Sequence, residues 1–276
     1  MSTFNTYETA WCPGCGNFSI LNCLKTALEE LGKDPNEVLM VAGIGQAAKT
    51  PQYISANSFC GLHGRGLPAA VAAKIANEEL TVVVNTGDGG GNHFIHNIRR
   101  NVDINHFVHD NQIYGLTKGQ ASPTTATGHV TPVQPDGSHN TPLNPILLAI
   151  ASGAGFVARS FSGDRDHLIA MMKEAIQYPG YALVDILQPC VSFNKINTFS
   201  YYKDRVYHLD KDYDPSNKTM AIQKAMEIED HIPIGVIYKE EKPNFHQKNE
   251  VLAQGKPLLD INTDTKVINH LIEEFI

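Results

Sequence analysis

The sequence predicts an α/β fold, a doubly wound and mostly parallel sheet with helices on both faces and a helical tail at the C-terminus. Two observations predict it. Short β-branched runs alternate with segments of helical spacing along most of the chain. One run, TVVVN at residues 81–85, is continuously apolar, which is typical of strands covered on both faces of a parallel sheet.

The first half of the chain shows this alternation clearly. Apolar residues recur at helical spacing over residues 17–32, and Gly32 supplies a stop. The segments that follow are predicted in chain order as a strand (38–42), a small, Ala-rich helix (68–77), a strand (81–85), a helix (94–101) and a strand (104–109).

The second half begins with a segment rich in Gly, Pro, Ser, Thr and His, from Gly115 to about Asn144. A loop of this length in a compact domain is usually a lid or a partner contact. We expect the next elements to be helix 147–153, strand 156–159, helix 166–177, strand 181–186, and tail helices at about 217–229 and 264–275 with a charged, Pro-punctuated link between them.

Composition excludes several classes of protein. A formal charge of −7 argues against a nucleic-acid binder, and no apolar run approaches the roughly 18 residues that a membrane-spanning helix needs. The start of the chain has neither a basic leader nor an apolar stretch, so we expect no export signal. Five cysteines are an odd number for a disulfide framework. We therefore expect a cytoplasmic protein with reduced thiols.

Two predicted strand ends carry oxygen ligands. Asp88 follows the strand at 81–85, and Asn111 follows the strand at 104–109. Carboxyl ends of parallel strands share one edge of the sheet, where ligands bind. Mg²⁺ prefers a shell of about six oxygens. That shell would be nearly complete with one carboxylate, one amide oxygen, one backbone carbonyl and two diphosphate oxygens. The alternative is that Gly87-Asp88-Gly89 forms only a tight turn.

Cysteines form a second candidate site. Cys12 and Cys15 in WCPGCG would lie on one turn, and Cys190 follows the predicted strand at 181–186. This spacing suits a tetrahedral metal or one face of an iron–sulfur cluster. A redox-active C-x-x-C pair is the alternative, but no strand is predicted before it. Cys23 lies on the apolar face of the first helix, so we expect it in the core.

Several motifs together resemble the β subunit of the 2-oxoacid:ferredoxin oxidoreductases, of the 2-oxoglutarate synthase-like type. They are WCPGCGN (11–17), GIG with Lys49-Thr50 (43–50), HGRGLPAA (63–70), TGDG (86–89), HxxRRN (96–101), DNQIYGLTKGQASPT (110–124) and PCVSFN (189–194). The resemblance implies the thiamine diphosphate-binding fold and an enzyme that oxidatively decarboxylates a 2-oxoacid with coenzyme A. Its products would be an acyl-CoA, CO₂ and reduced ferredoxin.

The resemblance also implies the roles of individual residues. Asp88, Asn111 and the carbonyl of Ile113 would hold Mg²⁺, and Cys12, Cys15 and Cys190 would bind a [4Fe–4S] cluster. Lys49 would face the substrate carboxylate, while His63 would donate a hydrogen bond to the diphosphate or serve a structural role. The residues that would line thiamine diphosphate are Ile44, Gly45, Gln46, Ala47, His63, Gly64, Asp88, Gly89, Asn111, Ile113, Gly115, Leu116 and Thr117.

The resemblance further implies a hetero-oligomer. A separate α subunit would supply the pyrimidine half of the cofactor site and the glutamate base, and ferredoxin would accept the electrons. Neither nucleic acid nor membrane is expected as a partner. Residues 1–200 would form the domain that binds thiamine diphosphate, Mg²⁺ and the cluster, and residues 201–276 would be an extension that packs on that domain or on a partner subunit.

The sequence departs from the family pattern at two places. Gln46 stands where many relatives carry a further cluster cysteine, so the fourth ligand would be Cys60, the nearest candidate, or Gln46 itself. The loop between Gly89 and Asn92 is short, which would draw the following helix toward the cofactor or remove diphosphate contacts. A non-oxidative thiamine diphosphate enzyme and a cofactor-poor, non-catalytic subunit are therefore the alternative functions.

Overall fold

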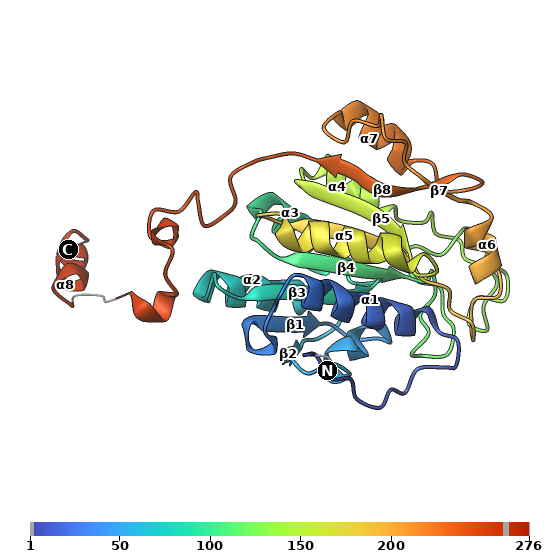
Figure 1. Ribbon diagram of the computed structural model, residues 1–276, viewed down its shortest axis with the longest axis horizontal. Helices are drawn as coiled ribbons and strands as arrows, with labels where there is room; N and C mark the ends of the chain where they lie inside the picture. Colours follow the sequence, from blue (N-terminus) through green and yellow to red (C-terminus); the bar gives the residue numbers. More distant parts are fainter. Residues whose placement is uncertain (1–2, 262–264, 276) are drawn as a thin grey trace.

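The computed structural model describes residues 3–261 and 265–275, and Figure 1 shows one sheet between two layers of helices. The strands are β1 Val38–Ala42, β2 Asn57–Cys60, β3 Thr81–Gly87, β4 Asn105–Asp110, β5 Phe156–Phe161, β6 Ala182–Leu187, β7 Val206–His208 and β8 Ile232–Lys239. The α-helices are α1 Gly16–Glu30, α2 Gly66–Ala76, α3 Phe94–Arg100, α4 Pro145–Ala151, α5 Arg165–Gln177, α6 Phe199–Lys203, α7 Lys218–Ala225 and α8 Thr265–Glu273. The 3₁₀ turns are η1 Pro35–Glu37, η2 Ala47–Gln52, η3 Gly91–His93, η4 Leu252–Gln254 and η5 Leu258–Asp260.

The sheet runs in the order β2-β1-β3-β4-β6-β5-β8-β7. Its strands are parallel from β2 through β5, while β8 pairs antiparallel with β5 and parallel with β7. Because β1, β3, β4 and β6 are neighbours, the segments that leave their carboxyl ends meet at one edge. The predicted doubly wound, mostly parallel sheet is confirmed.

Two apolar cores hold the helices against the sheet. On one face α1 and α5 pack together and cover side chains such as Met40, Val83 and Val184. On the other face α2, α3, α4 and α7 cover side chains such as Val82 and Leu183. The central strands β1, β3, β4, β5 and β6 therefore alternate their apolar side chains between the two cores, and Cys23 lies fully buried in the first core as predicted.

The predicted helices and strands of residues 17–186 are all present, with bounds that differ by a few residues. The predicted link between the two tail helices was wrong, because residues 232–239 of that segment form β8 within the sheet. The segment IPIGVIYK contains a proline and a glycine, which argue against a strand. It nevertheless pairs with β5 across a register shift, and its proline lies opposite the edge strand β7. Strands β2 and β7 and helix α6 were not predicted.

The C-terminal segment lies partly on the domain and partly away from it. Residues after β8 run along α2 and α3, where Phe245 donates a backbone hydrogen bond to Asn101 and His246 Nε2 lies 3.1 Å from the carbonyl of Lys74. Helix α8 then lies apart from the sheet (Figure 1). It agrees with the predicted helix at 264–275, of which residue 264 falls outside the described residues. The division at residue 200 remains a prediction.

None of the described helices is long and apolar enough to cross a membrane.

Two histidines on β4 are buried in the sheet without a charged partner. His106 lies 2.8 Å from Thr86 Oγ1 and 2.7 Å from Tyr181 Oη, while His109 lies 2.7 Å from Asn17 Oδ1. Burial lowers the pKa of both imidazoles to about 3. The His109 contact also fixes the start of α1, and with it the adjacent Cys12–Cys15 turn, to the middle of the sheet.

We predict that His106 makes the free energy of unfolding fall as the pH drops below about 6.5. In that range the His106 imidazole binds a proton in the unfolded chain but stays neutral in the folded protein, where its pKa is about 3. Between pH 7 and 5 this contributes a loss of about 2 kcal/mol, which His106→Gln removes. The measurement is urea unfolding of both proteins at the two pH values. Buried carboxyl groups act with the opposite sign in both proteins, so the difference isolates His106. His96→Gln, on the exposed side of α3, is the control, and equal pH slopes for wild type and His106→Gln would contradict the prediction.

Candidate functional site

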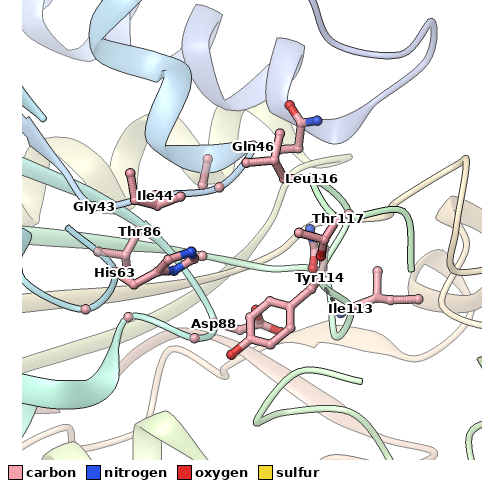
Figure 2. Close-up of a pocket in the computed structure, with 18 of the residues that line it drawn as sticks. Gly43, Ile44, Gln46, His63, Thr86, Asp88, Ile113, Tyr114, Leu116 and Thr117 are labelled. Atoms are coloured by element: carbon pink, nitrogen blue, oxygen red, sulfur yellow. Dashed lines mark hydrogen bonds between the residues drawn. The ribbon is translucent and has the colours of Figure 1, made fainter. Parts of the chain in front are cut away.

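A cavity of about 430 Å³ lies at the carboxyl edge of the sheet, between the segments that follow β1, β3 and β4. Figure 2 shows Gln46, His63, Asp88 and Tyr114 around this space. All thirteen residues predicted to contact the cofactor line it. The complete lining is Gly43, Ile44, Gly45, Gln46, Ala47, His63, Gly64, Thr86, Gly87, Asp88, Gly89, Gly90, Asn111, Ile113, Tyr114, Gly115, Leu116, Thr117 and Gln120.

Asp88 is the one carboxylate among these lining residues, and its side chain is buried. Ser122 and Thr124 donate hydrogen bonds to the same oxygen, Oδ2, at 2.5 and 2.6 Å. Burial raises the pKa of Asp88 to about 6, although the two hydroxyls oppose the shift. A buried carboxylate that its surroundings destabilise is a group that a bound cation would stabilise.

Asn111 and Ile113 line the same cavity, in the turn that follows β4. Asn111 Oδ1 accepts a hydrogen bond from the backbone N–H of Ile113 at 3.0 Å, and Gln112 between them has φ 56°. Asn194 donates to the Asn111 carbonyl at 3.1 Å, which fixes the turn from the far side. The turn therefore holds an amide oxygen at the cavity whose second lone pair can still take a ligand. Together with Asp88 it supplies the hard oxygen donors that Mg²⁺ prefers.

Close packing explains two of the glycines on the cavity floor. A Cβ atom on Gly89 would lie 2.6 Å from Tyr114 Oη, and one on Gly90 would lie 2.7 Å from Thr86 Oγ1. The short loop that follows them leads directly into η3, and α3 begins at Phe94. The loop thus brings bare backbone to the cavity wall, which suits the approach of a diphosphate.

Three cysteines share a second, smaller cavity beside the first. Cys12, Cys15 and Cys190 line it together with Gln46, Asn111 and Gly115, which line the larger cavity as well. Burial raises the pKa of the Cys15 thiol to about 11, and the neighbouring Cys190 and Cys12 add to the shift. The thiols are therefore close enough to influence one another's ionisation.

The environment of the thiols is polar on one side. Gln188 Nε2 lies 3.5 Å from Cys15 Sγ, as a donor to the sulfur, and Trp11 Nε1 donates to the Gln46 carbonyl at 2.9 Å. The buried Oε1 of Gln46 has no hydrogen-bond partner, and Figure 2 shows its amide directed away from the centre of the larger cavity.

Across the described ranges, 3–261 and 265–275, no three His, Cys, Asp or Glu side chains are arranged to hold a metal ion. The thiols thus form no ready site for one ion such as zinc.

Two predicted residues lie outside both cavities. Lys49 is half-buried on η2 and lines neither of them, so its role toward a substrate carboxylate stays a prediction. Cys60 is exposed at the end of β2 and is absent from the lining of the cysteine cavity, which Gln46 does line. Of the two candidates for a fourth cluster ligand, the geometry favours Gln46.

The sequence analysis missed the residues that support the site from behind. Ser122 and Thr124 belong to the long segment between β4 and α4 and reach back to Asp88, and Gln188 contacts Cys15. A hydroxyl-rich run, ASPTTATG, was the available signal, but nothing in its spacing indicates which hydroxyl meets which carboxylate.

Comparison with known families identifies both parts of the chain. Residues 38–186 match the family described as thiamine pyrophosphate enzyme, C-terminal TPP binding domain. Residues 190–254 match the family of the C-terminal part of the pyruvate ferredoxin oxidoreductase β chain. The first match contains the three strand ends that surround the larger cavity.

Individual relatives agree with the family matches. The 2-oxoacid:ferredoxin oxidoreductase subunit beta of Saccharolobus solfataricus is 47% identical, over 90% of this chain and 86% of that protein. The 2-oxoglutarate synthase subunit KorB of Methanocaldococcus jannaschii is 36% identical, over 88% of this chain and 92% of its own. A solved structure, 2-oxoglutarate:ferredoxin oxidoreductase from Magnetococcus marinus with 2-oxoglutarate, coenzyme A and succinyl-CoA bound, superimposes with a TM-score of 0.90 at 35% identity, covering 97% of this chain and 94% of that one.

Proposed function

The chain belongs to the β subunits of the 2-oxoacid:ferredoxin oxidoreductases, and we propose that it oxidatively decarboxylates a 2-oxoacid of the 2-oxoglutarate type with coenzyme A, within a hetero-oligomer. One observation carries the proposal. The cavity at the edge of the sheet collects every residue expected to contact thiamine diphosphate, and the cysteine cavity lies directly against it. The products are an acyl-CoA, CO₂ and electrons for ferredoxin.

The larger cavity fits the diphosphate half of thiamine diphosphate together with Mg²⁺. Asp88, Asn111 and the Ile113 carbonyl would hold the ion, while Gly89, Gly90 and Gly45 bring backbone close to the phosphate oxygens. Among the described lining residues neither Lys nor Arg neutralises the diphosphate, so the ion takes that role. His63 borders the cavity and is able to donate a hydrogen bond to a phosphate oxygen.

Thiamine diphosphate, when bound, supplies the electron sink for decarboxylation. This chain's own residues orient it and exclude water. Ser122 and Thr124 hold the Asp88 carboxylate in one position, and the turn at Gln112 fixes Asn111 in the lining of the same cavity. Such a rigid, pre-formed oxygen set matters because a ligand misplaced by about 1 Å loses much of its effect.

Another polypeptide completes the site. No glutamate is among the lining residues described, so the base that acts on the aminopyrimidine ring comes from another chain. The cavity lining also exposes large apolar side chains, among them Ile44, Tyr114 and Leu116. Exposed apolar groups around an open cavity indicate a surface that a protein partner covers, and an α subunit would cover this one.

The arrangement of three cysteines around one cavity favours an iron–sulfur cluster bound by three thiolates. Cys12, Cys15 and Cys190 would each bind one iron, and the Gln46 carboxamide, which lines the same cavity, would face the fourth. A carboxamide oxygen is a hard, weak ligand for iron in a sulfide cluster. We therefore propose that the fourth iron is held weakly and is lost on oxidation.

The three cysteines also argue against a non-oxidative enzyme, which has no use for a one-electron carrier. Reduced thiols of this kind fit the cytoplasm.

We predict that Asp88→Asn weakens Mg²⁺-dependent binding of thiamine diphosphate by about a hundredfold or more, because an amide removes the one negative ligand from the cavity. Isothermal titration of the purified chain with thiamine diphosphate, with and without Mg²⁺, measures the effect.

Asp110→Asn is the matched control for that experiment. Asp110 is an equally buried carboxyl whose Oδ1 lies 2.7 Å from Thr124 Oγ1, but it does not line this cavity. We expect its change to alter the affinity by no more than about fivefold, the size of one indirect hydrogen bond. Undiminished Mg²⁺-dependent binding by Asp88→Asn would remove Asp88 from the ion's ligands.

We predict that Gln46→Cys converts an oxygen-labile cluster into a stable one. After brief air exposure the native chain shows the EPR signal of an oxidised [3Fe–4S] cluster and loses about one iron in four, whereas Gln46→Cys keeps its iron and shows no such signal. Cys60→Ser leaves the native spectrum unchanged. Cys190→Ser lowers the iron content as much as Cys12→Ser does. A cluster that resists oxidation in the native chain but becomes labile in Cys60→Ser would show that Cys60, not Gln46, occupies the fourth position.

A further inference from the structure

The sulfur of Cys15 accepts a hydrogen bond from a side chain that has no role in the proposed function so far. Gln188 directly follows β6, and its Nε2 lies 3.5 Å from Cys15 Sγ. Among the three thiols at the cysteine cavity, Cys15 is the one for which the described residues supply a side-chain donor. The contact bears on redox chemistry, because hydrogen bonds to its sulfurs help to set the reduction potential of an iron–sulfur cluster.

Two further contacts hold the Gln188 carboxamide in this orientation. Nε2 also donates to the Pro189 carbonyl at 2.8 Å, and since a carbonyl only accepts, the nitrogen of the amide and not its oxygen faces the sulfur. The Gln188 backbone N–H donates to the Asp110 carbonyl at 2.9 Å, which ties the residue to β4. Gln188 is 1% exposed, so water does not compete for its amide.

Gly16, the neighbour of Cys15, leaves the space that this contact needs. A Cβ atom on Gly16 would lie 2.8 Å from Gln188 Cγ and 3.1 Å from its Nε2. Gly16 is also the first residue of α1 with Cys15 as the N-cap, so Cys15 lies at the positive end of the helix. The glycine in WCPGCGN therefore allows the amide to reach the sulfur, where a larger residue would push it away.

The surroundings of the thiols offer no charged group to an added electron. The lining that the structure describes for the cysteine cavity contains Asn17, Gln46, Asn111 and Gln188, but no Lys, Arg, His, Asp or Glu. Reduction adds one negative charge to a cluster, and in such a site neutral N–H groups must stabilise that charge. Of these four amides, Gln188 is the one whose side-chain N–H is directed at a sulfur atom.

We propose that Gln188 is a positioning residue that raises the reduction potential of the cluster through its hydrogen bond to Cys15. The proposal rests on the proposed function, which supplies both the cluster and the oxidation that delivers one electron to it. The electron adds negative charge to the sulfurs, no bond forms or breaks, and the amide keeps its proton. Because a hydrogen bond to a more negative acceptor is stronger, the amide stabilises the reduced cluster more than the oxidised one.

The test is a redox titration of the anaerobically purified full chain, followed by the EPR signal of the reduced cluster. Gln188→Met keeps the approximate volume of the side chain and removes the N–H donor. At the midpoint potential of the native chain, we expect the ratio of reduced to oxidised cluster to fall about tenfold in this variant, a shift of about 59 mV for one electron. The iron content should not change, since all three thiolates remain.

Asn105→Leu is the matched control. Asn105 is 2% exposed, donates to the Val82 carbonyl at 3.2 Å, and lies at the start of β4, away from the carboxyl edge of the sheet. We expect this variant to lower the thermal midpoint without moving the potential. An unchanged potential in Gln188→Met, or equal shifts in both variants, would overturn the inference. A native chain without a reducible cluster would instead contradict the proposed function itself.

A second measurement leaves Gln188 in place. In Gln46→Cys, Gln188 is the one glutamine that remains among the described lining residues of the cysteine cavity. With isotopically labelled nitrogen in the glutamine side-chain amides, pulsed EPR of the reduced cluster should show a coupling to one labelled nitrogen, because Nε2 lies within hydrogen-bond distance of Cys15 Sγ. The absence of this coupling would overturn the inference even where Gln188→Met fails to fold.

Discussion

The buried carboxylate of Asp88 is the charge on which the site depends. It lies at the end of β3, where burial makes its ionised form unfavourable, and two hydroxyls from the segment after β4 hold it in place. Thr124 also lies 2.7 Å from Asp110 Oδ1, so one hydroxyl joins the carboxyls of two adjacent strands. A hydroxyl has a single proton to donate, and burial together with the neighbouring carboxylates raises the Asp110 pKa well above its usual range. The protein therefore places two buried carboxyls side by side at this edge, where the cation proposed for the cofactor cavity would stabilise the ionised form of Asp88.

The topology explains why so much of this arrangement could be predicted from the sequence. In a parallel sheet the carboxyl ends of adjacent strands meet, so polar and glycine-rich segments after the strands at 38–42, 81–85 and 104–109 had to converge. The strands at 38–42 and 81–85 were recognisable because they are buried on both faces and read as continuous apolar runs. For these reasons the alternation of elements and the convergence of Asp88, Asn111 and the turn at 43–45 followed from local sequence, whereas the other lining residues were predicted from the resemblance to a family.

The remaining features depend on contacts that local sequence does not encode. Strand β8 contains Pro233 and Gly235, which argue against a strand, yet pairing with β5 and β7 outweighs that propensity. The contact of Thr124 with Asp88 spans 36 positions, and the ion pair of Arg159 with Asp185 spans 26. Side chains that meet through a loop, as Thr124 and Asp88 do, or through the register of two strands, as Arg159 and Asp185 do, leave no periodicity to detect. The same limit applies to Lys49 and Cys60, whose positions in sequence were close to the site but whose side chains lie outside both cavities.

Gln46 connects the two halves of the proposed chemistry. It lines the cofactor cavity and the cysteine cavity at once, so the wall between a bound cofactor and a bound cluster is as thin as one side chain. A cysteine at this position would bind iron, and its thiolate would add a negative charge to a wall that already faces a diphosphate. The neutral carboxamide of Gln46 avoids that repulsion, but it is a weaker ligand for iron than a thiolate. Its buried Oε1 has no hydrogen-bond partner in the described structure. If the proposed cluster is bound here, Gln46 would lower its stability and keep the wall neutral, and Gly115 and Asn111, the two other residues common to both cavities, would complete the thin wall between cofactor and cluster.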